Sequence, residues 1–402
     1  MSVLSYLEKL LNGVDIQWKT IGEVTLRTSN IKWREATRSY RYVDLTSVDI
    51  ETKKITETTE VTANNAPSRA QKLIEENDVI FATTRPTQQR FCLIDGEYSD
   101  EVASTGFCVL RAKQDEVLPK WIWHWISTSY FKEYVEENQS GSAYPAISDA
   151  KVKECYIPVP CPENPEKSLT IQSEIVRILD KFTALTAELT AELTAELTMR
   201  KKQYNYYRNQ LLSFEGGSVE WKSLGEVAII TIGAFVRKDK QNPDADYPVY
   251  NGGRTPTGYY EDFNNDGDKI IVSARGANAG FVNKSSTPYW AGNSCYSISV
   301  RSTEQLHWMY VYYYLKQSET KLTGIQQKGG IPAVSKKQME DLLLPIPSKS
   351  EQVRIVTILN KFDTLTSSIT EGLPREIELR QKQYEYYRDL LFSFPRPETA
   401  SN

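Results

Sequence analysis

Two short segments carry the side chains whose types and spacing are best suited to reading a nucleic acid. They are TTRPTQQR at 83–90 and SARGANAG at 273–280, and each follows an apolar run that predicts a β-strand. Arginine bonds guanine through two atoms, asparagine or glutamine does the same with adenine, and small neighbouring residues permit close approach. The candidate base-reading residues are therefore Arg85, Gln88, Arg275 and Asn278.

Further basic residues are interleaved with aromatic and small polar residues around both segments. Lysine and arginine also neutralise phosphates, which positions a protein on DNA. Any single basic residue is at least as often ordinary solvated surface, and the net charge of −4 is not the basic footprint typical of a nucleic-acid-binding protein. The further candidates are Arg34, Arg38, Arg41, Arg90, Arg237, Arg254 and Lys284.

The motifs of an enzyme that modifies or cuts DNA are missing from the sequence. No Pro-Pro dipeptide exists to form the loop that holds a flipped adenine, and neither G-x-G-x-x-G nor G-x-x-x-x-G-K-[ST] occurs. Two histidines and five cysteines without a C-x-x-C pair argue against a zinc site. We interpret the chain as non-catalytic, with no cofactor or metal of its own. The alternatives are a stand-alone methyltransferase or nuclease, or a purely structural scaffold.

Composition places the chain among ordinary globular proteins. Of its 402 residues, 40% are hydrophobic and 25% are charged, and no apolar run is long enough to cross a bilayer. The N-terminus has no basic region or small-residue cleavage site, so we interpret it as a short helix and not as a signal peptide. An odd number of cysteines suits a reducing compartment, and we expect a cytoplasmic protein.

The positioning elements are written twice in the chain. Four blocks recur in the same order, and the last two recur at the same offset of 180 residues, so the two segments from the third block to the end of the fourth are equally long. Trp121 aligns with Trp308 at the offset of the second block. The blocks are WKTIGEV (18–24) with WKSLGEV (221–227), 145–160 with 332–347, 172–182 with 352–362, and 203–214 with 383–394.

This plan predicts an α+β fold in which two globular α/β modules are joined by two long antiparallel helices, with a pseudo-two-fold internal repeat. Each module contains short predicted strands, at 77–86, 90–97 and 104–112 in the first, followed by one amphipathic helix, at 120–139 or 304–325. His124 and His307 lie in these helices as packed or surface residues. The predicted divisions are 1–13 (N-terminal helix), 14–160 (module one), 161–217 (helical region), 218–347 (module two) and 348–402 (helical region).

The two helical regions carry matching apolar stripes with a residue spacing of four. Such a stripe stays near one helix face and moves by about 40° per step. We expect the regions to pack as an intramolecular coiled coil, with the N-terminal helix docked beside the C-terminal end, and Gly372 and Pro374 to kink or break the second helix. The packing residues are Leu185, Leu189, Leu193 and Leu197 in the first stripe and Leu365, Ile369, Leu373 and Ile377 in the second.

The first helical region contains three copies of Thr-Ala-Glu-Leu at 186–197. Each copy lengthens a helix by about 6 Å, which is between one and two base pairs of DNA at about 3.4 Å per pair. The repeat therefore predicts a ruler that sets the distance between the modules. The module interiors differ, since 31–49 has no counterpart in 234–260, which indicates one task performed on two different targets.

On these residues the chain resembles the specificity subunits of type I restriction-modification systems. The segments at 203–214 and 383–394 are similar to the ends of that family's helical regions, and the repeat at 186–197 is similar to the spacer repeat of one subgroup. YPVYNGGRTPTGYY (247–260) with SARGANAG resembles one class of recognition domain, and YVDLTSVDIETKKI (42–55) with ASTGFCVLR (103–111) resembles another.

The resemblance implies that the modules are target-recognition domains, each reading one half of a bipartite double-stranded DNA target with a fixed gap. It implies two modification subunits as partners in an adenine methyltransferase, and two restriction subunits in the ATP-dependent nuclease. S-adenosylmethionine, ATP and magnesium would belong to those partners. No DNA contact carries over from the family, because each recognition domain reads a different sequence.

Overall fold

The computed structural model describes residues 13–214, 219–324, 330–368 and 370–395. It divides into two compact units, with residues 1–191 and 378–402 in unit 1 and residues 192–377 in unit 2. Each unit therefore contains one module together with parts of both helical regions, which cuts across the predicted divisions. The predicted N-terminal helix spans residues 1–13, of which 1–12 lie outside the described part of the chain.

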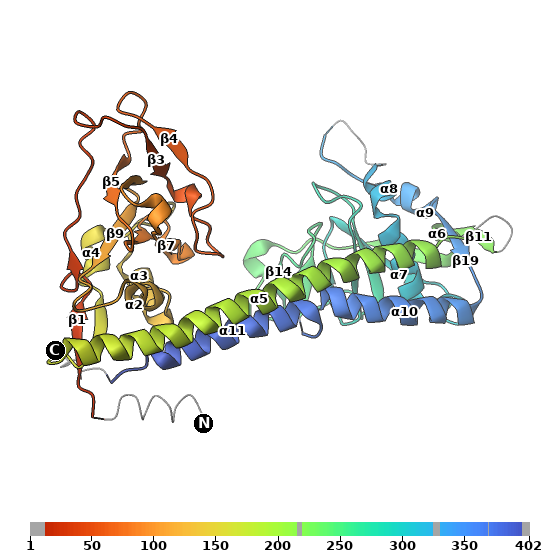
Figure 1. The fold of residues 1–402 in the computed structure, drawn as a ribbon. Coiled ribbons are helices and arrows are strands. Elements are labelled where there is room, and N and C mark those ends of the chain that lie inside the picture. The colour runs from red at the N-terminus through yellow and green to blue at the C-terminus, as the bar shows by residue number, and fades with distance from the viewer. Residues whose placement is uncertain (1–12, 215–218, 325–329, 369, 396–402) are drawn as a thin grey trace. The chain divides into compact units, whose positions relative to one another are not determined.

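Unit 1 is built around two four-stranded sheets, in the orders β2-β9-β6-β7 and β4-β3-β8-β5, and an antiparallel pair of β1 with β10 (Figure 1). Its buried core lies between the first sheet, the module helices and the helical regions. The strands are β1 (Ile16–Thr20), β2 (Thr25–Leu26), β3 (Tyr40–Val43), β4 (Thr59–Val61), β5 (Ala70–Ile74), β6 (Val79–Ala82), β7 (Phe91–Leu93), β8 (Glu101–Ser104), β9 (Phe107–Ala112) and β10 (Tyr156–Pro160); the module helices are α2 (Pro119–Trp125), α3 (Ser129–Asn138) and α4 (Asp149–Glu154).

Unit 2 repeats most of this topology, with a four-stranded sheet β12-β18-β15-β16, a three-stranded sheet β14-β13-β17 that has no strand in the place of β5 among the described residues, and the pair β11 with β19. Its strands are β11 (Glu220–Ser223), β12 (Ala228–Ile232), β13 (Tyr247–Tyr250), β14 (Gly258–Tyr260), β15 (Lys269–Ser273), β16 (Val282–Ser285), β17 (Trp290–Ala291), β18 (Cys295–Val300) and β19 (Leu343–Ile346); the module helices are α6 (Leu224–Val227), α7 (Trp308–Gln317), α8 (Glu319–Gly324) and α9 (Lys336–Glu340).

The divergent interiors share one strand order, so the prediction that 31–49 has no counterpart was wrong at the level of structure. In unit 1, β3 pairs antiparallel with β4 and parallel with β8, and in unit 2, β13 pairs antiparallel with β14 and parallel with β17. Pairing depends on backbone hydrogen bonds and on the alternation of buried side chains, which unlike sequences can satisfy equally.

The predicted module helices are each broken in two. In unit 1 the chain leaves α2 after Trp125, and the hydroxyl of Thr128 accepts a hydrogen bond from the amide of Phe131 to begin α3. In unit 2 the break falls at Ser318, between α7 and α8. A threonine or serine that bonds the backbone competes with the helix interior, which an apolar period by itself does not reveal.

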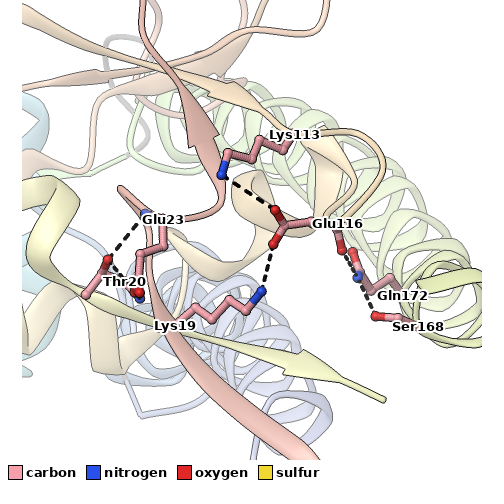
Figure 2. Close-up of polar contacts among 7 residues, drawn as sticks. All are labelled: Lys19, Thr20, Glu23, Lys113, Glu116, Ser168 and Gln172. Atoms are coloured by element: carbon pink, nitrogen blue, oxygen red, sulfur yellow. Dashed lines mark hydrogen bonds and ion pairs between the residues drawn. The ribbon is translucent and has the colours of Figure 1, made fainter. Parts of the chain in front are cut away.

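A buried glutamine ties each module to its helical region. The Gln172 side chain accepts a hydrogen bond from the Leu118 amide at 2.9 Å and donates to the Glu116 carbonyl at 2.9 Å. Figure 2 shows this contact continuing through the Glu116 carboxylate to Lys19 at 2.8 Å. In unit 2, Gln352 likewise accepts from the amide of His307 at 2.8 Å and donates to the Gln305 carbonyl at 3.1 Å.

The helical regions are α5 (Pro165–Leu211), α10 (Lys349–Ser367) and α11 (Leu373–Leu391). In unit 1, α11 lies beside α5 (Figure 1), where Phe182 stacks on Tyr387 and Thr183 shares a hydrogen bond with Tyr384. From Phe182 to Thr183 the chain moves forward along α5, while their partners move back along α11 from Tyr387 to Tyr384. The two helices are therefore antiparallel. In unit 2 the equivalent rings, Tyr207 and Phe362, stack at the same centroid distance of 5.6 Å.

The second helical region is interrupted, as predicted from Gly372 and Pro374. The helix stops at Ser367 and resumes at Leu373, so Pro374 falls in the first turn of α11, where a missing amide hydrogen costs nothing. Gly372 has a φ of +86°, and a Cβ there would lie 2.5 Å from the Thr364 carbonyl oxygen. The first helical region, in contrast, is one continuous helix that contains the whole repeat.

The packing seam along α5 follows a spacing near 3.5 residues and not four. Half-buried positions include Phe182, Thr186, Leu189 and Leu193, whereas the predicted Leu185 is 51% exposed. A stripe with spacing four drifts around the helix, and its first leucine therefore lies outside the seam. Of the other predicted packing residues, Ile369 lies outside the described residues, and those that are half-buried are Leu197, Leu365, Leu373 and Ile377.

A matched pair of polar contacts links α2 and α7 to the helical regions. In unit 1 the buried His124 Nε2 lies 2.9 Å from Asp180, and in unit 2 the Tyr313 hydroxyl donates to Asn360 at 2.7 Å. Asp180 and Asn360 are equivalent at the repeat offset of 180. Burial lowers the pKa of His124 despite the carboxylate beside it, and hydrogen bonds from His124 and Lys120 lower the pKa of Asp180 although burial opposes this.

We expect unit 1 to lose stability as the pH falls below about 6.5, the ordinary pKa of histidine. With its folded pKa lowered, His124 binds fewer protons in the folded chain than in the unfolded chain, so stability rises with pH in this window. The double variant His124→Tyr/Asp180→Asn installs the pair found in unit 2 and should flatten this dependence. Calorimetric unfolding between pH 5 and 8 provides the measurement. If the double variant kept the pH dependence of the wild type, His124 would not be its cause.

Candidate nucleic-acid interface

In unit 2, segments 251–254 and 275–280 meet and bring three predicted residues together. The Arg254 Nε donates to the Asn278 side-chain oxygen at 3.3 Å, and the Arg254 guanidinium lies over the Phe281 ring at 5.4 Å. The Asn278 amide group in turn donates to the Gly252 carbonyl at 3.5 Å. Asn278 and Phe281 thus orient the guanidinium group of the exposed Arg254. An oriented guanidinium group with its two terminal nitrogens directed outward is what bidentate recognition of guanine requires.

Glycine is required where these two segments touch. Gly252 has a φ of +79°, and a Cβ at this position would lie 3.0 Å from the carbonyl oxygen of Arg275. Arg275 itself is exposed, and its backbone bridges to Ala333. Arg254, Arg275 and Asn278 therefore form one cluster, which we call the unit 2 cluster.

In unit 1, Arg85 and Gln88 lie on the loop that follows β6, and both are exposed. Arg85 has a φ of +49°, in the left-handed region that costs a residue with a Cβ roughly 1–2 kcal/mol. Its backbone amide donates to the Pro145 carbonyl at 2.7 Å, and its guanidinium lies over the Tyr144 ring at 5.2 Å. A strained arginine on an exposed loop is typical of a functional position.

The two loops are equivalent, but their arginines are offset by one position. Thr84 bridges to Ala146 in unit 1, and Arg275 bridges to Ala333 in unit 2. The counterpart of Arg85 is therefore Gly276, which also has a positive φ, of +92°. The two modules therefore present their arginines from neighbouring positions of a loop whose backbone is the same in both.

The arginines predicted before and within β3 are mostly paired with acids of their own unit. Arg38 contacts Glu101 at 3.2 Å and lies over the Tyr40 ring, and Arg41 contacts Glu97 at 2.6 Å. These pairs are partly exposed, so DNA phosphates could exchange with the carboxylates. Arg34 is exposed in the turn before β3, and no described contact joins these three arginines to Arg85.

Two predicted residues serve the fold, and we remove them from the candidate interface. Arg90 donates to the backbone carbonyls of Leu45 and Val48, which anchors a 3₁₀ turn. Lys284 contacts Asp363 of α10 at 2.8 Å and lies over the Tyr312 ring, so its charge is satisfied against the helical region. Both are internal contacts between segments distant in sequence, for which the sequence gives no signal.

Arg237 is exposed beside Asp239, at 3.6 Å, in the segment before β13. No described contact places it in the unit 2 cluster. Sequence reasoning missed Phe281 as the ring beneath Arg254 and Tyr144 as the ring beneath Arg85, because each pair comes from separate segments. The signal present was an aromatic residue next to a small-residue loop, as in Gly280-Phe281 and Ala143-Tyr144.

The described residues contain no group of three or more histidine, cysteine, aspartate or glutamate side chains placed to hold a metal ion. Within the same part of the chain, no helix combines the length and the apolarity that crossing a bilayer requires. All five cysteines are free thiols, and burial raises the pKa of Cys92, Cys108 and Cys295 to about 12.

The sequence matches the family described as the type I restriction modification DNA specificity domain twice, over residues 15–199 and 218–379. The chain therefore belongs to this family, and it is a specificity subunit, the part that recognises DNA and not the part that catalyses the reaction. Each match covers one module and most of the helical region that follows it.

Curated relatives agree with this assignment, and solved structures share the fold. The chain is 40% identical to the type I restriction enzyme EcoR124I/EcoR124II specificity subunit of Escherichia coli over the full length of both, and 34% identical to the EcoprrI specificity subunit over 92% of this chain and 93% of that one. Its fold resembles a chain from a structure on complex assembly of the type I R-M system (TM-score 0.70, 24% identity, 94% and 97% covered). It also resembles the HsdS subunit from Thermoanaerobacter tengcongensis (TM-score 0.55, 24% identity, 94% and 96% covered).

Proposed function

We propose that each unit reads one half of a bipartite DNA target, unit 1 through Arg85 and Gln88 and unit 2 through the unit 2 cluster. One observation carries this proposal: the first sheet, three strands of the second sheet and the loop backbone occur twice in the same arrangement, yet the side chains at the loops differ. A duplicated frame with unlike contact residues is what recognition of two different half-sites needs.

The continuous helix α5 sets the separation of the half-sites, and its Thr-Ala-Glu-Leu copies are the adjustable part. This assigns the chain to the subgroup of specificity subunits with a repeated spacer. The support is that all three copies lie inside one helix of 47 residues, while the second helical region is interrupted and has no such repeat.

The partners follow from the duplication. Two modification subunits bind the chain, one for each repeat of the helical regions, and two restriction subunits complete the nuclease. S-adenosylmethionine, ATP and magnesium are bound by those partners and not by this chain. The protein works in the cytoplasm, for which five free cysteine thiols are suitable.

Mapping methylated adenines across the genome of a host that carries the chain and its modification subunits tests the proposal. The expected result is a two-part motif with a gap of fixed length. A single contiguous motif would contradict it, and S-adenosylmethionine binding by the isolated chain would favour a stand-alone methyltransferase. A scaffold role predicts that exchanging a module with that of a relative leaves the motif unchanged.

The variant Arg85→Gly should separate DNA reading from folding. We expect binding of the unit 1 half-site to weaken by about 1–3 kcal/mol if Arg85 reads a base, while unfolding becomes about 1 kcal/mol harder because glycine relieves the positive φ. Titrations on targets mutated in one half-site at a time, together with thermal unfolding, measure both effects.

The matched variant for the other half-site is Arg254→Ala, which should weaken only the half-site of unit 2. If both variants reduced binding equally on all DNA sequences, the two arginines would be phosphate contacts and not base readers.

A further inference from the structure

Two large apolar side chains, Tyr144 and Ile331, stand out as the most exposed of their kind in the described part of the chain. Tyr144 is 71% exposed and Ile331 is 76% exposed. They belong to different units, and each directly precedes the block Pro-Ala-Ile-Ser or Pro-Ala-Val-Ser of the internal repeat. They therefore occupy equivalent positions in the two modules.

The backbone next to both residues is fixed against the candidate DNA-reading loop. The amide of Arg85 donates to the carbonyl of Pro145 at 2.7 Å, and the amide of Gly276 donates to the carbonyl of Pro332 at 2.9 Å. The β-bridges from Thr84 to Ala146 and from Arg275 to Ala333 lie one residue further on. Tyr144 and Ile331 are thus held beside the turn that presents the arginine of each unit.

Burying a side chain of this size would contribute about 1.5–3 kcal/mol to the stability of the fold. A side chain that stays exposed does not make this contribution, so the stability of the isolated protein does not explain its position. The two residues share no side-chain chemistry beyond size and apolarity, and the surrounding loops differ in sequence. The common property is therefore an apolar projection at one point of a shared frame. Such a projection beside a cation matches the side chains that other proteins insert between stacked bases.

The arginine near each of these residues favours DNA over another protein as the partner that Tyr144 and Ile331 contact. The Arg85 guanidinium lies over the Tyr144 ring at 5.2 Å. In unit 2 the exposed Arg275 directly precedes Gly276, whose amide donates to the Pro332 carbonyl beside Ile331. An apolar side chain flanked by arginine can meet a base face while the arginine bonds the edge of a neighbouring base.

We propose that Tyr144 and Ile331 are wedge residues, each of which inserts at a base step of the half-site that its own unit reads and partly unstacks it. This inference rests on the proposed function, because it assumes that each unit contacts a half-site. It adds that recognition includes a local deformation of the DNA, so sequence preference also arises from how easily that step unstacks.

The test uses the complex of the full chain with its modification subunits and a bipartite target that contains 2-aminopurine. The probe is placed in turn at each half-site position other than the methylated adenines, because a flipped target base would also fluoresce. We expect one position in each half-site to brighten on binding. Tyr144→Ala should abolish the signal in its own half-site only and weaken binding about tenfold, and Ile331→Ala should do the same in the other.

Two further variants make the result specific. Tyr144→Phe keeps the ring and should retain the fluorescence, whereas Tyr156→Ala removes a tyrosine that is 52% exposed on β10 of the same unit and should change nothing. Normal thermal unfolding of Tyr144→Ala shows that the loss is not a folding defect.

Three outcomes would overturn the wedge. One is wild-type binding without a fluorescent step, and another is a signal that survives Tyr144→Ala. The third is a variant that binds DNA normally but no longer retains the modification subunits on size exclusion, which would make these residues a protein contact. In each case the wild-type complex still binds its bipartite target, so the proposed function is judged separately.

Discussion

Removal of Thr190–Leu193 from α5 is expected to shorten the gap between the two half-sites by one to two base pairs and to leave the bases that are read unchanged. Four residues of helix correspond to about 6 Å of length and about 40° of rotation. The rotation is small, so the half-buried seam of α5 keeps facing its partner helices in each unit. Both modules therefore remain folded and assembled.

The affinity for the original target should fall by about 10²–10⁴-fold, because the second half-site can no longer be engaged together with the first. Binding should recover on a target whose gap is shortened. Titrations against a series of targets that differ by one base pair in the gap measure this shift. Recognition of different bases at unchanged spacing would rule out α5 as the ruler.

A deletion of Ala191 and Glu192 alone is the matched control. Two residues rotate the following helix by about 200°, which turns the seam toward solvent. This variant should bind no target of any gap and should unfold at lower temperature. If it instead behaved like the deletion of four residues, length alone would matter and the helix packing would not.

Phe392→Ala should destabilise unit 1 by about 3–5 kcal/mol, although Phe392 lies more than 200 residues from the unit 1 module in sequence. Its ring is 5% exposed and lies 4.8 Å from the centroid of Trp121 and 5.4 Å from that of Trp125. Nearby, the Trp18 indole donates to the carbonyl of Pro395 at 2.8 Å. The end of the second helical region is thus part of the core of unit 1.

The matched variant is Leu212→Ala, at the equivalent position 180 residues earlier. Leu212 is 3% exposed in the core of unit 2, and its loss should cost about 2–5 kcal/mol there. Hydrogen exchange of the full chain distinguishes the units, since each variant should lower protection in one unit only. Equal loss in both units after Phe392→Ala would contradict this division of the core.

Equivalent residues were predicted well where the two copies share blocks and less well inside the modules. The pairing of Trp121 with Trp308 was wrong: Trp121 donates to the Pro158 carbonyl, and the residue that bonds the equivalent Pro345 carbonyl is Tyr310. The module helices lie at different distances from the shared block at 145–160 and 332–347, because the segments between each helix and that block differ in length. An alignment anchored on the blocks cannot detect such a shift.

The candidate interface combines residues proposed from the sequence with contacts that only the structure shows. The loops after β6 and β15 were recognised from an arginine among small residues, and the structure places both beside the repeated Pro-Ala segment. Arg90 and Lys284 have the same residue types but bind carbonyls and a carboxylate of the fold. Charge and loop position do not distinguish these roles, because the partner of each cation lies far away in the sequence.

The sequence by itself determined the duplication, the continuous helix with its four-residue repeat and the break before Pro374, because these depend on local composition and on residues a few positions apart. Only the tertiary structure decided which leucines of α5 lie in the seam, which arginines remain exposed and which residues complete each core. Those properties depend on contacts between distant segments, where a rotation of 40° or a loop one residue longer changes the neighbour that a side chain meets.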